Sequence, residues 1–178
     1  MRKILWGLAA LLLLPLAAAQ AAAASLPFTP PALLQRVNSA IAAANARGLH
    51  FGVLSAQSDG SLVSALQGPS GDLGVILVVL PARTGAIQAA SVVSHQQSAS
   101  EQPMTLYAMM GQMALIHALD PALIGPQASR LLFGLAQQIQ APGRSAGRTQ
   151  ADGVRYDLRF LAQTQSLVFT ARPQPAAK

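Results

Sequence analysis

Residues 74–80, Gly-Val-Ile-Leu-Val-Val-Leu, constrain the fold more than any other stretch of the chain. In an extended segment, successive side chains point to opposite faces, so this run places apolar groups on both faces. A strand of this kind lies at the centre of a sheet, with helices over at least one face and apolar material over the other. The sequence therefore predicts a layered fold in which the sheet is covered on both sides at this point.

Shorter apolar or alternating runs on either side of this segment predict its neighbours in the sheet. Turn residues separate these runs, at Asp59-Gly60 and in the loop 68–72. Near the C-terminus, residues 154–160 alternate strictly between apolar and charged side chains, which predicts a strand with one buried face. Tight turns between consecutive strands favour an antiparallel sheet of about six strands, at residues 49–55, 62–66, 74–80, 87–95, 154–160 and 167–172.

Three segments have the apolar spacing of helices that pack on a sheet. The first begins at Pro30, after the capping residue Thr29, and ends near Gly48. The second, residues 103–119, is apolar on nearly all sides and is predicted to be buried, whereas the third, Gln127 to Gln140, is amphipathic. The fold class is therefore α+β, with helices packed on the sheet and the element order helix, four strands, two helices, two strands.

The first 24 residues have the three-part order of a secretory signal peptide. Arg2 and Lys3 precede an apolar run from Ile4 to Leu16, and a tract of small residues follows. Small side chains allow cleavage after Ala19 or, as we prefer, after Ala24. The alternative, an uncleaved membrane anchor, is disfavoured because alanine is barely apolar enough to hold a helix in lipid.

The rest of the chain is predicted to form a single domain over residues 25–172, followed by a disordered tail over residues 173–178. Because the chain has no cysteine, a lipid-modified N-terminus, disulfides, thiolate metal sites and a cysteine nucleophile are excluded. Removing Arg2 and Lys3 with the signal leaves ten cations against six acids, a net charge of +4. This excess permits contact with an anionic lipid, glycan or acidic partner, and it does not indicate nucleic acid. We expect a periplasmic or secreted protein that is not a lipoprotein.

Several core and turn residues follow one another in an order that is also found elsewhere. They are Gly153, Arg155-Tyr156, Leu167, Phe169 and Pro173 and, more loosely, residues 113–121, Leu131-Leu132 and the N-terminal Pro-Phe-Thr-Pro-Pro-Ala-Leu-Leu-Gln-Arg-Val-Asn. In this order the chain resembles a family of secreted proteobacterial proteins known as a domain of unknown function. The resemblance favours export and this fold class, and it implies no activity.

Residues that could carry catalysis are few and scattered. The chain has only the histidines His50, His95 and His117, and no two have the spacing that would place them on one helical face. A zinc site built from all three is a minor alternative, because His117 is expected to lie partly buried at a helix C-terminus, where the helix dipole favours its protonated form. Glu101 is the only glutamate, and most aspartates stand at turns or caps. We therefore predict no catalytic residue, no metal ligand and no cofactor.

The C-terminal segment concentrates the positive charge of the chain. Strand alternation places Arg155, Asp157 and Arg159 on one face and Tyr156 on the other. The favoured interpretation of these charges is a solvated ladder, and the functional alternative is a patch that binds an anionic partner. Residues 142–149, which are rich in Gly, Ser and Arg and are predicted to be a mobile loop, would contribute to it. The complete candidate patch is Arg144, Arg148, Arg155, Asp157, Arg159 and Arg172.

These patterns predict an exported, non-enzymatic binding or accessory protein of the cell envelope. Its partner would be an anionic envelope component or another exported protein, and not nucleic acid. Two alternatives stay open. One is a hydrolase or metal-dependent enzyme that uses dispersed His and Asp residues, and the other is an inhibitor or immunity-type protein that covers another exported protein.

Overall fold

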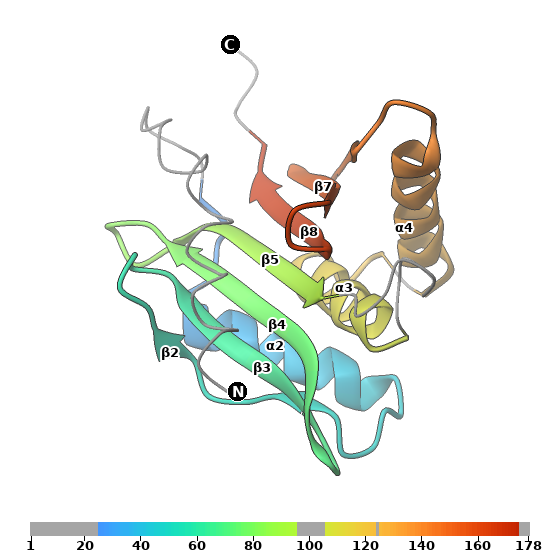
Figure 1. Cartoon of the computed structure of the whole chain (residues 1–178). Coiled ribbons are helices and arrows are strands. Elements are labelled where there is room, and N and C mark those ends of the chain that lie inside the picture. The colour runs from blue at the N-terminus through green and yellow to red at the C-terminus, as the bar shows by residue number, and fades with distance from the viewer. Residues whose placement is uncertain (1–24, 96–105, 124, 175–178) are drawn as a thin grey trace.

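The computed structural model describes residues 25–95, 106–123 and 125–174, and over these ranges the chain has three helices and eight strands. Figure 1 shows their arrangement. The elements in chain order are α2 (Pro30–Ala43), β1 (His50–Phe51), β2 (Ser55–Ala56), β3 (Leu62–Gly68), β4 (Gly71–Pro81), β5 (Ile87–His95), α3 (Leu106–Leu119), α4 (Gly125–Gln140), β6 (Ala146–Ala151), β7 (Val154–Leu161) and β8 (Ser166–Pro173). The α+β class is confirmed, whereas the predicted count of six strands was wrong, and the order is one helix, five strands, two helices and three strands.

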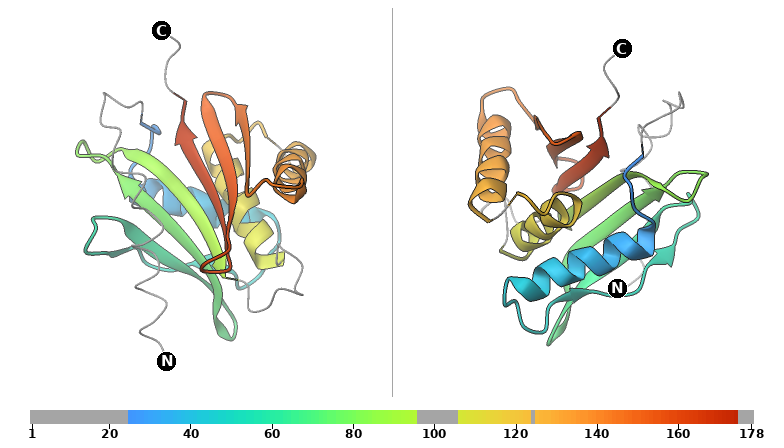
Figure 2. Two further views of the ribbon diagram at one scale, coloured as in Figure 1. Left: turned by 45° about the horizontal axis from the view of Figure 1, so that its top comes forward. Right: turned by 180° about the vertical axis from the view of Figure 1, so that it is seen from behind.

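All strands pair in an antiparallel manner, in the order β1-β3-β4-β5-β8-β7-β6, with β2 also on β3. The chain therefore lays down one half of the sheet before α3 and α4 and the other half after them, and β5 and β8 join the two. The three described helices lie on one side of the sheet (Figure 2). We call the other side the open face.

Two strands that the sequence did not predict account for the difference between six and eight. Residues 49–55 form two short strands, because five residues from Phe51 to Ser55 oppose four from Leu66 to Val63, and the extra residue interrupts the pairing. The segment 142–149, predicted as a mobile loop, contains the start of β6. Its polar sequence gives no alternating apolar signal, and its place in the sheet is fixed instead by contact with α4.

Contact between β6 and α4 is close and specific. The backbone N–H of Arg148 donates to Oε1 of Gln138 on α4, at 2.8 Å. At the preceding position, a Cβ added to Gly147 would lie 2.6 Å from the carbonyl oxygen of Leu135. Only glycine allows the helix to approach β6 so closely.

A constant offset of 79 residues relates β4 and β5 in one half of the sheet to β7 and β8 in the other. Val78 on β4 is paired with Ser91 on β5, and Asp157 on β7 is paired with Thr170 on β8, each residue 79 positions after its counterpart. Ser91 and Thr170 are also paired with each other across β5 and β8, and their hydroxyl oxygens are 2.9 Å apart. The pair therefore lies on a pseudo-twofold axis that relates the two halves.

The core fills the space between the sheet and the helices. On β4 and β7, equivalent positions of the two halves supply buried apolar side chains to it, and the ring of Tyr156 stacks on Phe169 with centroids 5.8 Å apart. The equivalent pairs are Val75 and Val154, Leu77 and Tyr156, and Val79 and Leu158. The predicted burial of Tyr156 is thus confirmed.

The start of α2 and the ends of α3 and α4 agree with prediction, whereas α2 ends at Ala43, before Gly48, and α4 begins at Gly125 rather than at Gln127. Helix α2 begins at Pro30, although the side chain of Thr29 makes no capping hydrogen bond. Helix α3 ends at Leu119 with His117 half-buried in its last turn, and residues 103–105 of the predicted helix lie outside the described residues. No helix within the described ranges is long and apolar enough to cross a membrane.

The predicted domain boundary falls slightly short at the C-terminus. Strand β8 includes Pro173, and the N–H of Gln174 donates to the carbonyl of Gly153 at 2.7 Å. The domain therefore reaches past residue 172. The predicted signal peptide, residues 1–24, and the last four residues of the predicted tail lie outside the described ranges.

Candidate anion-binding surface

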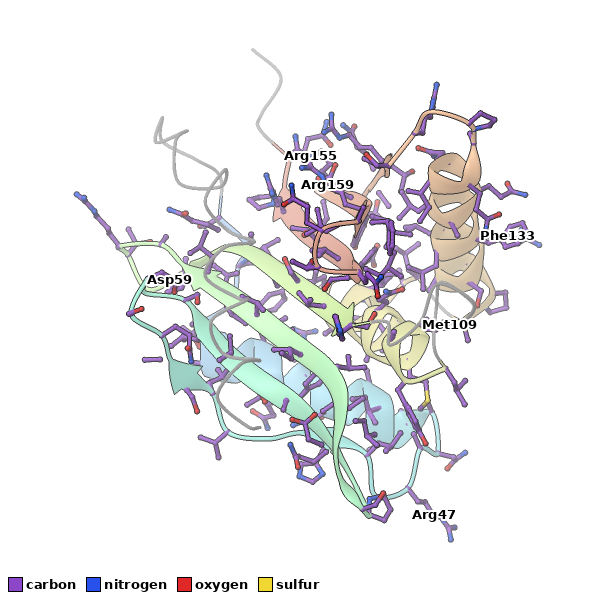
Figure 3. All side chains as sticks on the ribbon, in the orientation of Figure 1. Arg47, Asp59, Met109, Phe133, Arg155 and Arg159 are labelled. Carbon is purple, nitrogen blue, oxygen red and sulfur yellow. The ribbon has the colours of Figure 1, made fainter. Side chains whose placement is uncertain are left out.

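Strands β6, β7 and β8 gather arginines on the open face. Because Val154, Tyr156 and Leu158 face the helices, Arg155, Asp157 and Arg159 project to the other side. The pairing register then sets Arg148 on β6 opposite Asp157, and Arg172 on β8 opposite Arg155. Figure 3 shows Arg155 and Arg159 on this part of the sheet. We call Arg148, Arg155, Asp157, Arg159 and Arg172 the arginine cluster.

Asp157 is the buried centre of the arginine cluster. Its side chain is only 4% exposed, and its two carboxylate oxygens accept from Nε of Arg148 at 2.7 Å and from Nε of Arg155 at 3.2 Å. The favoured interpretation of a solvated charge ladder was therefore wrong for Asp157. Strand alternation predicts on which face of the sheet a side chain lies. The burial of Asp157 also depends on side chains from neighbouring strands, and alternation does not identify those strands.

Arg172 is the least satisfied member of the cluster. It is half-buried, and its Nε atom is shielded from solvent without a hydrogen-bond partner in the described structure. Burial lowers the pKa of the Arg172 guanidinium, Asp157 acts in the opposite direction, and the arginines of the cluster lower it further. By contrast, its hydrogen bond to Asp157 raises the pKa of Arg148. One carboxylate thus faces four guanidinium groups, and one of these has an unused donor.

Arg144 is the one predicted patch residue that the structure does not bring into the cluster. It is exposed in the turn after α4, where its N–H donates to the carbonyl of Ala141. The charges that act on Arg172 are those of Asp157, Arg155, Arg159 and Arg148, and Arg144 is not among them. Arg148, predicted to reach over from a loop, is instead held by a strand.

Sequence reasoning missed the polar row that continues from Asp157 across the sheet. Thr170 is the cross-strand neighbour of Asp157, and Ser91 follows on β5. Both are buried polar residues. Each satisfies the other through its hydroxyl, so the open face has a buried polar seam at the pseudo-twofold axis. In the sequence, the only sign of this polar seam was the presence of single hydroxyl residues inside apolar strands.

Beyond this seam, the open face becomes apolar. Ile76, Val78 and Leu80 on β4 occupy the positions that correspond to Arg155, Asp157 and Arg159. None of the described helices packs on this side of the sheet (Figure 2), although Val78 is buried and Ile76 and Leu80 are half-buried. One continuous face thus carries arginines on one half and aliphatic groups on the other.

Other chemical groups do not converge in this way. His50 and His95 are exposed on β1 and β5, and His117 is half-buried on α3. Among the described residues, no group of three or more His, Cys, Asp or Glu side chains could hold a metal ion. An acidic pair does form, because a hydrogen bond to Asp120 raises the pKa of Asp152, as does the negative charge of Asp120.

No family model, no curated protein and no solved structure matches the chain. The resemblance to a domain of unknown function therefore stays a prediction.

Proposed function

We propose that this chain is an exported, non-enzymatic binding protein of the cell envelope, and that the arginine cluster binds an anionic partner. The charge balance of the cluster is the observation that carries the proposal. Asp157 engages Arg148 and Arg155, whereas Arg159 is exposed and Arg172 retains an unpartnered Nε. Guanidinium groups that lack a protein carboxylate are suited to an external carboxylate or phosphate.

The position of the cluster also supports binding. Its side chains stand on three paired strands, which hold them at fixed spacing, and the edge strand β6 is fixed by Gln138. A rigid array reduces the conformational entropy that is lost when an anion binds. Export follows from the leader-like order of Arg2, Lys3 and the apolar run Ile4 to Leu16.

The two alternative functions differ from this proposal in what they require. An inhibitor or immunity-type protein would use the same arginine cluster against an acidic surface of another exported protein. A hydrolase or metal-dependent enzyme would need histidines and acids in one place, and among the described residues no group of three or more such side chains could hold a metal ion.

Retention on phosphocellulose tests the binding proposal directly. The comparison uses the chain without its leader, the variant Arg155→Gln/Arg159→Gln, and the control Arg47→Gln/Arg83→Gln. Both control residues are exposed and lie outside the cluster, so the two variants have equal net charge. We expect the cluster variant to elute at lower salt than the control, with a weaker dependence on salt. Equal elution of the two variants would overturn the proposal.

Affinity capture from envelope extracts with the same three proteins would then identify the partner. A component that the control retains and the cluster variant loses is the expected result.

The leader is tested separately, because the mass of the protein in the envelope fraction distinguishes cleavage after Ala24 from an intact Met1. An intact Met1 in the membrane pellet would contradict export by a cleaved signal.

A further inference from the structure

We propose that the open face binds an anionic phospholipid, with the head group on Arg155 and Arg172 and the acyl chains on the apolar half of the sheet. This inference rests on the proposed function and adds the class of the ligand. It depends on the fact that an apolar surface and a cationic surface lie side by side on one continuous face. A ligand with both an apolar and an anionic part would contact both surfaces.

The first step concerns the apolar half. Ile76 and Leu80 on β4 and Val93 on β5 are half-buried, and they surround the buried Val78. In a soluble domain, a run of aliphatic side chains on a sheet is normally covered by a second layer. The described helices are all on the other side (Figure 2). The aliphatic groups that remain partly accessible therefore offer a surface for an apolar ligand.

The second step concerns the boundary between the halves. Val93 on β5 is paired with Val168 on β8, which is paired in turn with Arg159 on β7, so the apolar and cationic surfaces meet across adjacent strands. Between β4 and β7 there are three strand spacings, or about 14 Å, which an extended acyl chain can cover. Charge complementarity selects the head group, since the cluster has an excess of guanidinium groups. A small soluble anion would use only the arginine half.

The third step concerns the head group itself. Arg172 is paired in register with Arg155, which places two guanidinium groups side by side on β8 and β7. The carboxylate of Asp157 occupies Nε of Arg155 and leaves Nε of Arg172 without a partner. A phosphodiester accepts hydrogen bonds from two adjacent guanidinium groups through its two free oxygens. The two arginines thus suit the head group of an anionic phospholipid such as phosphatidylglycerol.

Sedimentation with vesicles tests this directly. The chain without its leader is mixed with vesicles of phosphatidylglycerol or of phosphatidylcholine. We expect binding only to the former. Arg155→Gln/Arg172→Gln should weaken it by about 30-fold, at about fivefold for each arginine near an anionic surface. The charge-matched control Arg47→Gln/Arg83→Gln should weaken it far less.

A second variant pair tests the apolar half. Ile76→Thr/Val93→Thr keeps β-branched side chains but adds hydroxyl groups, and we expect binding about tenfold weaker than that of the parent. The control is Phe133→Gln, which removes a side chain that is 65% exposed on α4 and so on the helix side (Figure 3). Urea midpoints of all variants show whether a loss of binding reflects unfolding.

The outcomes separate this inference from the proposed function. Loss of vesicle binding in both open-face variants, with both controls intact, supports a phospholipid ligand. If Ile76→Thr/Val93→Thr binds as the parent does, or if the parent ignores phosphatidylglycerol vesicles, the phospholipid inference is overturned. Retention on phosphocellulose that still depends on Arg155 would then leave a soluble anion or an acidic protein as the partner. The proposed function itself fails only if that dependence is absent.

Discussion

The two halves of the sheet share a backbone plan and differ in the chemistry of one face. Toward the helices, both halves place buried apolar groups at equivalent positions of β4 and β7. On the open face β4 and β7 diverge, since Ile76, Val78 and Leu80 in the first half correspond to Arg155, Asp157 and Arg159 in the second. The helix-facing side must fill one common core and is therefore constrained in both halves. The open face has no such requirement, and it is there that chemical differences between the halves are tolerated.

The strongest test of this comparison exchanges one residue between the halves. Val78→Asp places a carboxylate at the position that corresponds to Asp157, but without arginines around it. Val78 is 4% exposed, so an uncompensated buried charge should lower the free energy of unfolding by about 5 kcal/mol. Urea denaturation measures the loss, and Val78→Ala is the control for lost volume. A small effect of Val78→Asp would show that this half of the open face is already hydrated.

The next largest effect is expected on the side that the halves have in common. Tyr156 corresponds to Leu77, is fully buried and stacks on Phe169. Tyr156→Ala should cost about 3–5 kcal/mol of unfolding free energy, as for other buried aromatic truncations. Tyr156→Phe keeps the ring and removes a buried hydroxyl that has no hydrogen-bond partner in the described structure. It should therefore leave stability unchanged or raise it by up to about 1 kcal/mol. A clear loss of stability in Tyr156→Phe would mean that the hydroxyl is satisfied.

The reverse exchange, Asp157→Val, is predicted to be milder than Val78→Asp. It removes the acceptor for Arg148 and Arg155, and hydrogen bonds to a charged group contribute about 1.5–3 kcal/mol. The loss stays limited because the Arg148 side chain is 58% exposed and can be hydrated. Chemical denaturation at low and high salt measures it. Asp157→Asn, which keeps an acceptor, is the matched control and should lose less.

The smallest expected effect concerns pH and the turn between β6 and β7. The pKa of Asp152 is raised above its ordinary value of 3.8 by a hydrogen bond to Asp120 and by the charge of Asp120. The folded chain therefore holds this proton more tightly than the unfolded chain. The associated stability is present below the ordinary pKa and is lost as the pH rises through the raised pKa.

Asp152→Asn is the variant that tests this pH dependence. Asparagine is well suited to the turn, because Asp152 has a φ of 44° and is followed by Gly153 with a φ of 74°. We expect the variant to melt slightly above the parent at neutral pH and to equal it in acid, with a flatter profile in thermal melts over that range. A constant difference at every pH would instead indicate an effect of turn geometry.

How far the sequence predicted this fold depends on the kind of signal each element carries. Proline before a periodic apolar run identified the start of α2, and strict alternation identified β7 and the face of Tyr156. Strand β6 was missed because its position depends on a helix packed over Gly147, which is tertiary information. Local pattern alone cannot supply contacts of this kind.

For the candidate surface, too, local pattern predicted some features, and others depend on tertiary contacts. Alternation placed Arg155, Asp157 and Arg159 together, and the hairpin brought Arg172 to them. The burial of Asp157 could not be predicted, because it depends on Arg148 from a strand that the sequence did not reveal. The seam of Ser91 and Thr170 joins residues of different halves, so it required the sheet order.

The hydrogen bond from Arg148 to Gln138 has a consequence for assembly. A border strand with free N–H and C=O groups is a template to which another chain can add a strand. Gln138 takes one of these donors on β6, and α4 lies against the same strand. At the other border, β1 and β2 are short and separated by Gly52 to Leu54. Within the described sheet neither border offers a long straight run for strand addition, so the partner proposed above is left the broad face of the sheet rather than its ends.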